Sequence, residues 1–489
     1  MESFEKLRPV DRLERYSTAR HDLKFYLGPA VTASYRLPKS HSPRLKECIY
    51  KALEDVITRH PILSAIPLNE NTQNPYFVRL PEIHLDKCVY FQARQRDYDP
   101  DSSDGERDVE LDELFSTQHR VPYEPPNPFW RLYILTNSVH PSDFTAALFY
   151  HHALGDGTSG MAFHRAFHSA LSQSVSTLPT ELAPASVIPS PSAPLLPSLE
   201  SLHPLPVSTW HLLTILFKHK IWSSRDPGLW TGAKCTIALG PQTGARHLAF
   251  SASSTTAFKN ICRANGTTIT GALQTLIAGA LFAHLPEKYT KLACNGALSA
   301  RRFLPADAGI TDDSMGVYVL DMSDTYMRDR FLQHQHTDSK SGRYDLLPWA
   351  EAQRSRENIE QVLGLKGRNA AVGLLRYVND YQQELFLSKV GKDRDSSFEV
   401  SNLGVFKPSS SPPTVVVEEG NAQGVEIGRM VFTQSAGVTA SAIQVSAITG
   451  PDGCLVLGVT WQKGVVDDEL VEKVLRSVEE EVKRLTGTD

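Results

Sequence analysis

The chain has 489 residues, of which 41% are hydrophobic and 21% charged, and its formal net charge is −5. This length exceeds what one hydrophobic core usually supports, and the composition is that of a soluble globular protein. The small net charge gives no basic footprint for nucleic acid, and no apolar run approaches the roughly 20 residues that span a bilayer. We therefore expect two domains or one two-lobed unit, without a nucleic-acid partner or an integral membrane segment.

The N-terminus and the cysteines indicate an intracellular protein. The opening MESFEKLRPVDRLERYS alternates charge with isolated apolar residues and lacks the apolar segment of a secretory signal. The six cysteines form no C-x-x-C pair, which disfavours a zinc knuckle and a disulfide framework. We expect reduced core cysteines and a cytoplasmic location, with peripheral attachment to internal membranes left open.

The first part of the chain has the pattern of helices combined with a mixed sheet. Residues 44–61 carry apolar side chains at helical spacing, and Pro61 follows as a stop signal. Short runs rich in β-branched and aromatic residues predict strands at 76–80, 88–92, 130–135 and 144–151. Gly157, Thr158 and Ser159 then offer capping chemistry to a helix through MAFHRAFHSAL.

Residues 179–206 form the clearest linker in the chain. Their eight prolines remove backbone donors too often for a regular element. The predicted subdomains are therefore 1–178, which contains the histidine motif discussed below, and 207–489. Residues 208–222 follow as a short amphipathic helix, for which burial is favoured over tunnel lining or contact with a membrane.

The second part of the chain repeats the combination of helices and strands. Helices are predicted at 255–266, at 268–285 and at the C-terminus over 467–485. Strands are predicted at 246–250, 291–303, 316–322, 397–406, 440–449 and 454–462. Both halves thus read as an α/β (α+β) protein in which each half has its own mixed sheet.

The segment HHALGDG, which begins at His151, places two histidines and an aspartate directly after a predicted buried strand. Spacing alone leaves three interpretations open: the histidines end a strand, they bind a metal with Asp156, or one imidazole is a general base near neutral pH. Metal binding is disfavoured because no second cluster has a ligand spacing. His164 and His168, four residues apart on a helix, are expected on the surface or lining a groove.

This segment resembles the H-H-x-x-x-D-G signature of the chloramphenicol acetyltransferase-like superfamily, which includes peptide-synthetase condensation domains, plant BAHD acyltransferases and fungal alcohol acetyltransferases. The opening LRPVDRLERYSTARHDLKFY is similar to the start of the fungal family, and SARRFL and VSNLGVF follow in the second half. The D-F-G-W-G motif of the plant enzymes is absent. The chain therefore resembles the fungal alcohol acetyltransferases over nearly its whole length.

The resemblance implies two similar halves, each a mixed sheet with helices, with a tunnel between them and a catalytic histidine at its middle. It implies a CoA-dependent O-acetyltransferase that moves acetyl from acetyl-CoA directly to an alcohol, such as a fungal secondary metabolite. Acetyl-CoA is then a co-substrate, and we expect no tightly bound cofactor, no metal and a monomer. The rivals are an N-acyltransferase on an amine such as a sphingoid base, a carrier-dependent condensation enzyme, and a non-catalytic binding protein of the same fold.

The resemblance also implies roles for the residues of the motif. His152 matches the general base, whose δ-nitrogen bonds its own backbone carbonyl and leaves the ε-nitrogen free. Asp156 matches a structural residue that pairs with an arginine, and we favour Arg301 over Arg302 by its place in the motif. Gly157 allows close backbone approach and a free φ angle.

Three further residues have expected places near the reaction centre. His151 is assigned to packing or to lining the tunnel. Ser401 and Asn402, in VSNLGVF, match a region near the developing oxyanion, although they also fit a plain strand end. No phosphate-binding loop of the G-x-x-x-x-G-K-S/T type occurs, so the residues that meet the CoA phosphates are unassigned.

Overall fold

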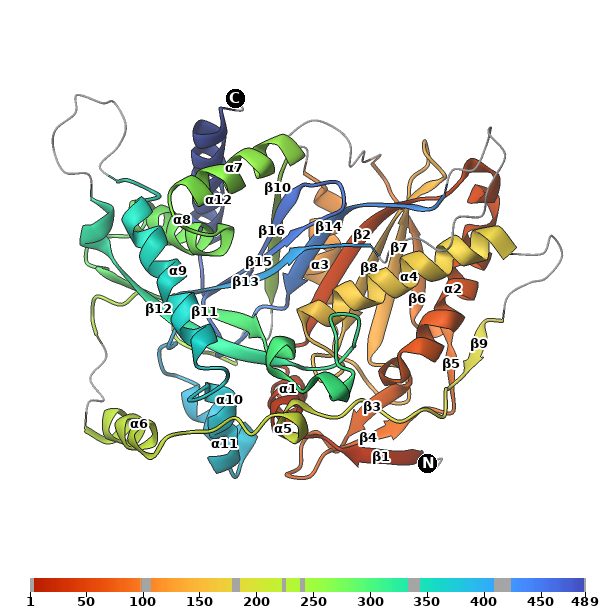
Figure 1. The fold of residues 1–489 in the computed structure, drawn as a ribbon, viewed down its shortest axis with the longest axis horizontal. Coiled ribbons are helices and arrows are strands. Elements are labelled where there is room, and N and C mark those ends of the chain that lie inside the picture. Colours follow the sequence, from red (N-terminus) through yellow and green to blue (C-terminus); the bar gives the residue numbers. More distant parts are fainter. Residues whose placement is uncertain are drawn as a thin grey trace.

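The computed structural model describes residues 4–96, 98, 107–177, 185–221, 226–237, 242–332, 344–408 and 424–487. Within them two mixed β-sheets lie side by side, and each has helices packed against it (Figure 1). The predicted α/β architecture of two sheet-and-helix halves is therefore confirmed.

The first sheet carries the strand that leads into the histidine motif. Its order is β14 (Glu426–Gln434), β2 (Pro29–Arg36), β8 (Asp143–Tyr150), β7 (Trp130–Thr136) and β6 (Val89–Ala93). Neighbouring strands are antiparallel except β6 and β7, which are parallel. All of β8 beyond its first residue is buried, because α2 (Leu45–Arg59) and α4 (Gly157–Thr177) cover one face and α3 (Val109–Gln118) the other. That burial explains its continuous apolar run.

β14 belongs to this first sheet although it lies near the end of the chain. It pairs antiparallel with β2, so that Val431 stands opposite Thr32. The sequence predicted neither strand. The first sheet thus contains residues from both sides of the predicted linker.

The second sheet is formed by the latter part of the chain. Its order is β10 (Thr243–Phe250), β16 (Leu455–Gln462), β15 (Ile443–Thr449), β13 (Phe398–Val405), β11 (Lys291–Ser299) and β12 (Val319–Met327). The helices packed with it are α7 (Ala252–Ala264), α8 (Ile269–His284), α9 (Trp349–Gly364) and α12 (Asp468–Thr486). In α12 the valines at 471, 474, 478 and 482 recur every three or four residues, and all are buried in the core of this half.

Smaller elements complete the fold, and some of them lie in the predicted linker. They are the sheet β1 (Glu5–Pro9), β4 (Tyr76–Arg79) and β3 (Ala65–Leu68), the pair β5 (Glu82–His84) and β9 (Val187–Pro189), and helices α1 (Arg12–Asp22), α5 (Leu199–Leu202), α10 (Ala371–Leu374) and α11 (Tyr381–Leu385). The prediction that residues 179–206 hold no regular element is therefore wrong for β9 and α5. β9 is stabilised by the buried side chain of Ile188. α5 lies between two prolines, and the side chain of Ser198 caps its N-terminus.

The helix predicted after the linker is α6 (Thr209–Ile221), which lies on the outside of the molecule at the lower left of Figure 1. The expectation that it is buried is wrong, because Trp210, Leu213 and Phe217 are 79%, 58% and 55% exposed. An amphipathic pattern shows that a helix has an apolar stripe, but it does not show what covers the stripe. In the described part of the chain no single helix is long and apolar enough to cross a membrane, and α7 and α8 reach that measure only as a pair bent by 95°.

Candidate active site

The candidate site lies in the turn that joins β8 to α4. The turn follows Tyr150, whose hydroxyl donates a hydrogen bond to the carbonyl of Asp156 at 2.6 Å. The Asp156 carboxylate caps α4 by accepting from the backbone N–H of Ser159 at 3.0 Å. The capping function expected of residues 157–159 therefore belongs to Asp156.

Gly157 is needed for space rather than for an unusual backbone angle. A Cβ atom at this position would lie 2.5 Å from the side chain of Leu403 and 3.1 Å from the ring of Phe432. The φ angle of Gly157 is not positive, so the expected freedom of φ is not used. The glycine thus lets the start of α4 approach β13 and β14 closely, as the sequence interpretation expected.

His152 faces a cavity of about 610 Å³ that is lined by residues of both halves. The expected hydrogen bond between Nδ1 and the backbone carbonyl of His152 is not formed, because Nδ1 is buried without a hydrogen-bond partner in the described part of the chain. The expected freedom of Nε2 is observed, since it has no partner among the described residues and His152 lines the cavity. Burial, and next the positive charge of Arg20, lower the pKa of His152 to about 3, although its own backbone carbonyl acts in the opposite direction. The imidazole is therefore neutral at pH 7 and can accept a proton at Nε2.

Asp156 pairs with Arg301, the arginine that the motif favoured over Arg302. The two Asp156 oxygens accept from Nη1 and Nη2 of Arg301 at 2.7 and 3.0 Å, and both residues are buried. Burial alone would raise the pKa of Asp156, but the Arg301 guanidinium holds that pKa below its ordinary value. Arg301 lies in a short 3₁₀ turn just after β11 and not, as expected, in the strand itself.

The Asp156 carboxylate also joins the two halves of the molecule. Its Oδ2 accepts from the backbone N–H of Tyr318 at 3.0 Å. The backbone N–H of Asp156 donates to the carbonyl of Gly316 at 3.1 Å. Arg301, Gly316 and Tyr318 all belong to the second half, so this residue fastens the motif turn to the opposite side of the cavity.

One wall of the cavity is unusually polar. The Arg20 guanidinium lies 3.8 Å from the ring centroid of Tyr26 and makes no ion pair with a described residue. The Tyr26 hydroxyl donates to Gln434 at 3.2 Å, and the Gln434 amide donates to the carboxyl of Glu399 at 3.2 Å. Burial raises the pKa of Glu399. This wall therefore presents a guanidinium, an amide and a carboxyl group to a polar ligand.

Ser401 and Asn402 both line the cavity from the middle of β13. The Asn402 amide donates to Thr270 at 3.0 Å, and its carbonyl oxygen accepts from the N–H of Gly404 at 2.8 Å. The Ser401 hydroxyl makes no hydrogen bond to a described residue and lies in the cavity wall. Ser401 is thus free to donate to a ligand, whereas both polar groups of the Asn402 side chain are engaged within the protein.

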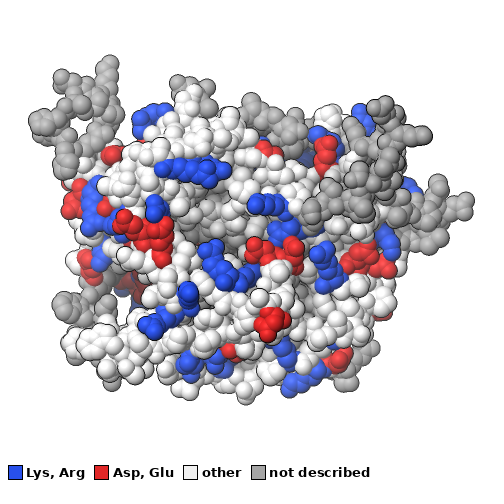
Figure 2. Space-filling model, viewed as in Figure 1, with Lys and Arg blue, Asp and Glu red and all other residues white. Residues whose placement is uncertain are grey.

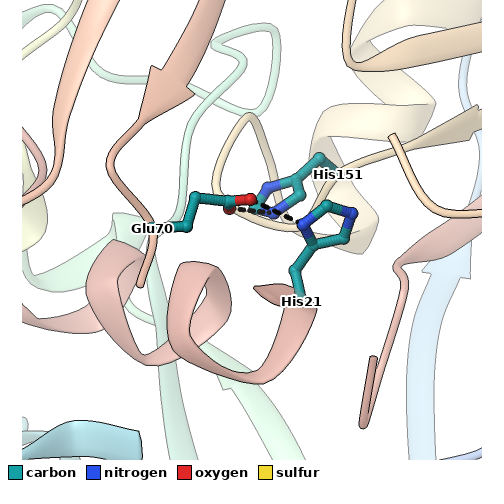
Figure 3. Close-up of side chains that lie close together, drawn as sticks. All are labelled: His21, Glu70 and His151. Atoms are coloured by element: carbon teal, nitrogen blue, oxygen red, sulfur yellow. Dashed lines mark hydrogen bonds and ion pairs between the residues drawn. The ribbon is translucent and has the colours of Figure 1, made fainter. Parts of the chain in front are cut away.

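His151 lies behind the turn with His21 and Glu70 (Figure 3). Its Nε2 is 3.0 Å from one Glu70 oxygen, and His21 Nδ1 is 2.7 Å from the other. The side chains of His21, Glu70 and His151 are only 5%, 11% and 1% exposed. The expected place of His151 in the tunnel wall is wrong, because its side chain is directed away from the cavity lining; the expected packing place is the observed one.

The second histidine pair of the sequence is also internal. His164 is fully buried and is bonded to the Tyr35 hydroxyl and the Val31 carbonyl, both at 2.9 Å. His168 lies 2.9 Å from the carbonyl of Val425. The expectation of a surface pair is therefore wrong for His164, because α4 packs this face against the first sheet. Each ring serves backbone hydrogen bonding.

Sequence reasoning missed several side chains near His152. Arg20, His21 and Tyr26 stand in the opening block that carried the family resemblance, and Glu399 precedes Ser401 by two residues, so position within known blocks could have found them. Glu70 lies in the polar hairpin segment NENTQNP, which gives no sign that one carboxylate turns inward.

Comparison with known proteins identifies the family. The sequence profile of the alcohol acetyltransferase family matches residues 10–480. Probable alcohol acetyltransferase crmB of Aspergillus fumigatus is 34% identical over 478 residues, which cover 96% of this chain and 97% of that protein. Probable alcohol acetyltransferase FCK4 of Fusarium pseudograminearum is 22% identical, with 97% and 94% covered.

Solved structures share the fold. TRI3 trichothecene 15-O-acetyltransferase from Fusarium sporotrichioides superposes with a TM-score of 0.69 at 15% identity, over 98% of this chain and 94% of that one. The condensation domain of the monacolin K polyketide synthase MokA gives a TM-score of 0.57 at 10% identity, over 100% and 99%. At such identities the likeness concerns the fold alone, whereas the match of the family profile and of crmB covers sequence and length together. The chain belongs to the alcohol acetyltransferase family.

Proposed function

We propose that the protein transfers an acetyl group from acetyl-CoA directly to the hydroxyl of a small-molecule alcohol, with His152 as the general base. One observation carries the proposal: a neutral imidazole turns its unpaired Nε2 into a cavity that both halves of the molecule line. Family membership supports the acyl transfer. Acetyl-CoA is a co-substrate in this proposal, and no tightly bound cofactor is required.

The proposed reaction needs one base and one donor. Nε2 of His152 accepts the hydroxyl proton while the acceptor oxygen attacks the thioester carbonyl, which forms the new C–O bond and an oxyanion. The free hydroxyl of Ser401 is the group available to donate to that oxyanion. Collapse of the intermediate breaks the C–S bond, and the imidazolium returns the proton to the CoA thiolate. No acyl-enzyme forms, so no nucleophilic serine or cysteine is required.

Asp156 and Arg301 support this chemistry without touching the reacting atoms. Their ion pair fixes the turn that carries His152 against the second half. In this proposal the pair keeps Nε2 at a constant distance from the bound substrates, which matters because small displacements of a catalytic group cost large factors in rate.

Arg302 is the residue that we assign to the acetyl-CoA phosphates. It is exposed, lines the cavity, and makes no ion pair with a described residue. A free guanidinium suits phosphate recognition.

A second candidate function keeps the same base but uses an amine acceptor, giving an N-acyltransferase. The observation that favours it is Glu399, a carboxyl group in the cavity wall whose described hydrogen-bond donor is Gln434 alone. The ammonium of an amine acceptor would pair with that carboxylate and pass one proton to it, and the neutral nitrogen would then attack the thioester while His152 accepts its second proton.

The test is to incubate the purified full chain with acetyl-CoA and matched alcohols and amines, and to follow free thiol and product mass. An ester product with thiol release supports O-acetylation, and an amide product supports the second candidate. A protein that binds these compounds but releases no thiol above the rate without protein would contradict both and indicate a binding protein of the same fold.

A further inference from the structure

The group formed by His21, Glu70 and His151 lies next to His152 but outside the proposed reaction (Figure 3). Glu70 belongs to the loop between β3 and β4. Asn69 before it adopts a left-handed conformation with φ of 60°, and the Glu70 carboxylate ends in the protein interior, 11% exposed. A carboxylate that leaves a polar loop to sit between two buried imidazoles needs a physical reason.

Hydrogen bonds from the backbone indicate where the protons of the two histidines lie. Nδ1 of His151 accepts a hydrogen bond from the N–H of Ala153 at 3.0 Å, so the ring proton must be on Nε2, which faces Glu70. Nε2 of His21 accepts from the N–H of Tyr123 at 3.1 Å, so its proton must be on Nδ1, which also faces Glu70. Both imidazoles are thus neutral and turn their N–H toward one carboxylate. His21 Nδ1 donates to one oxygen at 2.7 Å, whereas His151 Nε2 lies 3.0 Å from the other without hydrogen-bond geometry.

This arrangement is not that of a metal site, although three potential ligands lie close together. A histidine that binds a metal through one nitrogen carries its proton on the other and donates it to an acceptor. Here the other nitrogen of each ring faces a backbone N–H, which cannot accept a proton. If a metal bound His21 Nδ1 and His151 Nε2, the proton of each ring would move to the other nitrogen. That N–H would then face a backbone N–H, so that two donors would oppose each other at both rings.

The surroundings leave no replacement for Glu70. Ring centroids of His21, Phe129 and Tyr123 lie 4.4, 5.5 and 6.2 Å from that of His151, so its Nε2 side is enclosed by other rings. Burial lowers the pKa of His151 to about 4, while burial is overcome at Glu70 by the two histidines, which lower its pKa to about 2. Without the carboxylate, the buried N–H of His21 would lose its acceptor and the buried N–H of His151 would lose the negative charge that faces it at 3.0 Å.

We propose that Glu70 is a positioning residue that fixes the tautomers of His21 and His151 and thereby holds both sides of the His152 site. On one side, the Nδ1 of His151 bonds the backbone of the turn that contains His152. On the other side, His21 lies in the last turn of α1 directly after Arg20, whose side chain lines the cavity. Glu70 therefore sets the base and the nearest cation relative to each other. This inference rests on the proposed use of His152 as the base.

The first measurement concerns the wild-type chain and needs no acceptor. Ring-¹⁵N histidine labelling with long-range ¹H–¹⁵N correlation reports each tautomer, and His21→Gln and His151→Gln variants assign the two rings. We expect the Nδ1–H form for His21 and the Nε2–H form for His151, and no bound zinc, manganese or iron in the purified protein. The opposite tautomers, or a stoichiometric metal, would overturn the inference even if O-acetylation were correct.

The second measurement uses Glu70→Gln, whose amide offers one acceptor and one donor where two acceptors are needed. We expect loss of one tautomer signal, a shifted His152 resonance, and kcat about 10²-fold lower with unchanged KM for acetyl-CoA, as for a displaced base. Glu70→Asp keeps two acceptor oxygens and should recover most of the loss. Glu82→Gln is the matched control, because Glu82 faces His84 in an exposed pair at 3.0 Å.

Two results of this measurement overturn the inference. One is a Glu70→Gln variant with unshifted His152 resonance; the other is kcat within threefold of wild type for an acceptor that the wild type acetylates. If no compound in the panel is acetylated, the proposed function fails on its own, and the His152 resonance still decides whether Glu70 positions that ring.

Discussion

Two groups of side chains hold the turn that carries His152, and they differ in charge and in reach. In the group of His21, Glu70 and His151, one carboxylate lies between two neutral imidazoles and accepts a hydrogen bond from His21, and all three residues come from the first 151 positions. At Asp156, a carboxylate faces a guanidinium and a backbone N–H from the second half of the chain. The first group is local and the second spans the cavity.

The difference shows which part of the site each group can control. The histidine group determines the local geometry of the turn, because His151 accepts from the N–H of Ala153, and it ties the last turn of α1 to the backbone N–H of Tyr123 through His21. The ion pair determines how the turn lies relative to the opposite wall, which carries Ser401 and Arg302. Loss of the first should alter the base, and loss of the second should alter the fit between the halves.

The largest effect on turnover is expected when the base alone is removed and both the histidine group and the ion pair stay intact. His152→Ala should lower kcat by roughly 10²–10⁴-fold, the usual contribution of a general base. Its unfolding temperature should stay close to wild type, because Nε2 has no described partner. The measurement is steady-state kinetics with thermal melting. His151→Gln, the comparison variant, should lose less turnover but more stability; equal loss of turnover in both would contradict the assignment of the base.

The ion pair is tested next, by a double-mutant cycle. Asp156→Asn and Arg301→Gln should each cost about 3–5 kcal/mol of unfolding free energy, because either change leaves a buried charge unpaired. The double variant should cost less than the sum, since the second change then removes an orphan charge. Denaturant unfolding of the four proteins measures this. Additive losses would show that the two charges do not interact, and Arg302→Gln should leave stability unchanged.

Substitutions of Ser401 and Arg302 test the cavity wall whose position relative to the turn the ion pair determines. Ser401→Ala should lower kcat by about 10²-fold if its hydroxyl donates to the oxyanion, equivalent to about 3 kcal/mol. Arg302→Gln should instead raise KM for acetyl-CoA about three- to tenfold with little change in kcat. Initial-rate kinetics with varied acetyl-CoA separate the two effects. Arg356→Gln, in an exposed pair with Glu360, is the control.

Acidification should destabilise the protein by protonating buried histidines before it disrupts the ion pair of Asp156 and Arg301. Burial lowers the pKa of His60, His151 and His164 to about 4 and of His119 and His152 to about 3. Their folded values lie below the unfolded value of about 6.5, so the unfolded chain binds more protons as pH falls. Stability should be complete above pH 6.5 and fall by up to about 1.4 kcal/mol per pH unit for each histidine down to about pH 4.

The Asp156 pair responds in the lower range. Its folded pKa is depressed, so its contribution is present above the unfolded value of about 4 and is lost only below that. The melting temperature should therefore decrease between pH 8 and pH 4, a range in which Asp156 is still ionised. A flat profile from pH 7 to pH 5 would mean that these histidines are not buried as neutral rings.

The smallest expected effect is that of a chelator. Activity and melting temperature should be unchanged after prolonged EDTA treatment, because the protons of His21 and His151 occupy the positions that a metal would need. Loss of activity that zinc restores would contradict this and would show that the histidine group is a metal site.

The sequence predicted most elements, because long periodic segments decide them locally. Residues 44–61 gave α2, and the runs around 130–151 gave β7 and β8. Pairing over long separations carries no local signal, so neither β2 nor β14 was expected, and the exposure of Trp210 on α6 was not either. In the site, the motif named His152, Asp156 and Arg301, whereas Glu70 is placed by a loop conformation that composition does not specify.

The position of β14 also constrains how the protein can be made. β2 leaves the ribosome long before its partner β14 has been translated, so the nascent first sheet has an open edge during most of synthesis. A fragment that ends at the proline-rich segment would keep that edge permanently and would tend to self-associate. Expression of the two pieces from separate genes should therefore give soluble material only when both are made in the same cell.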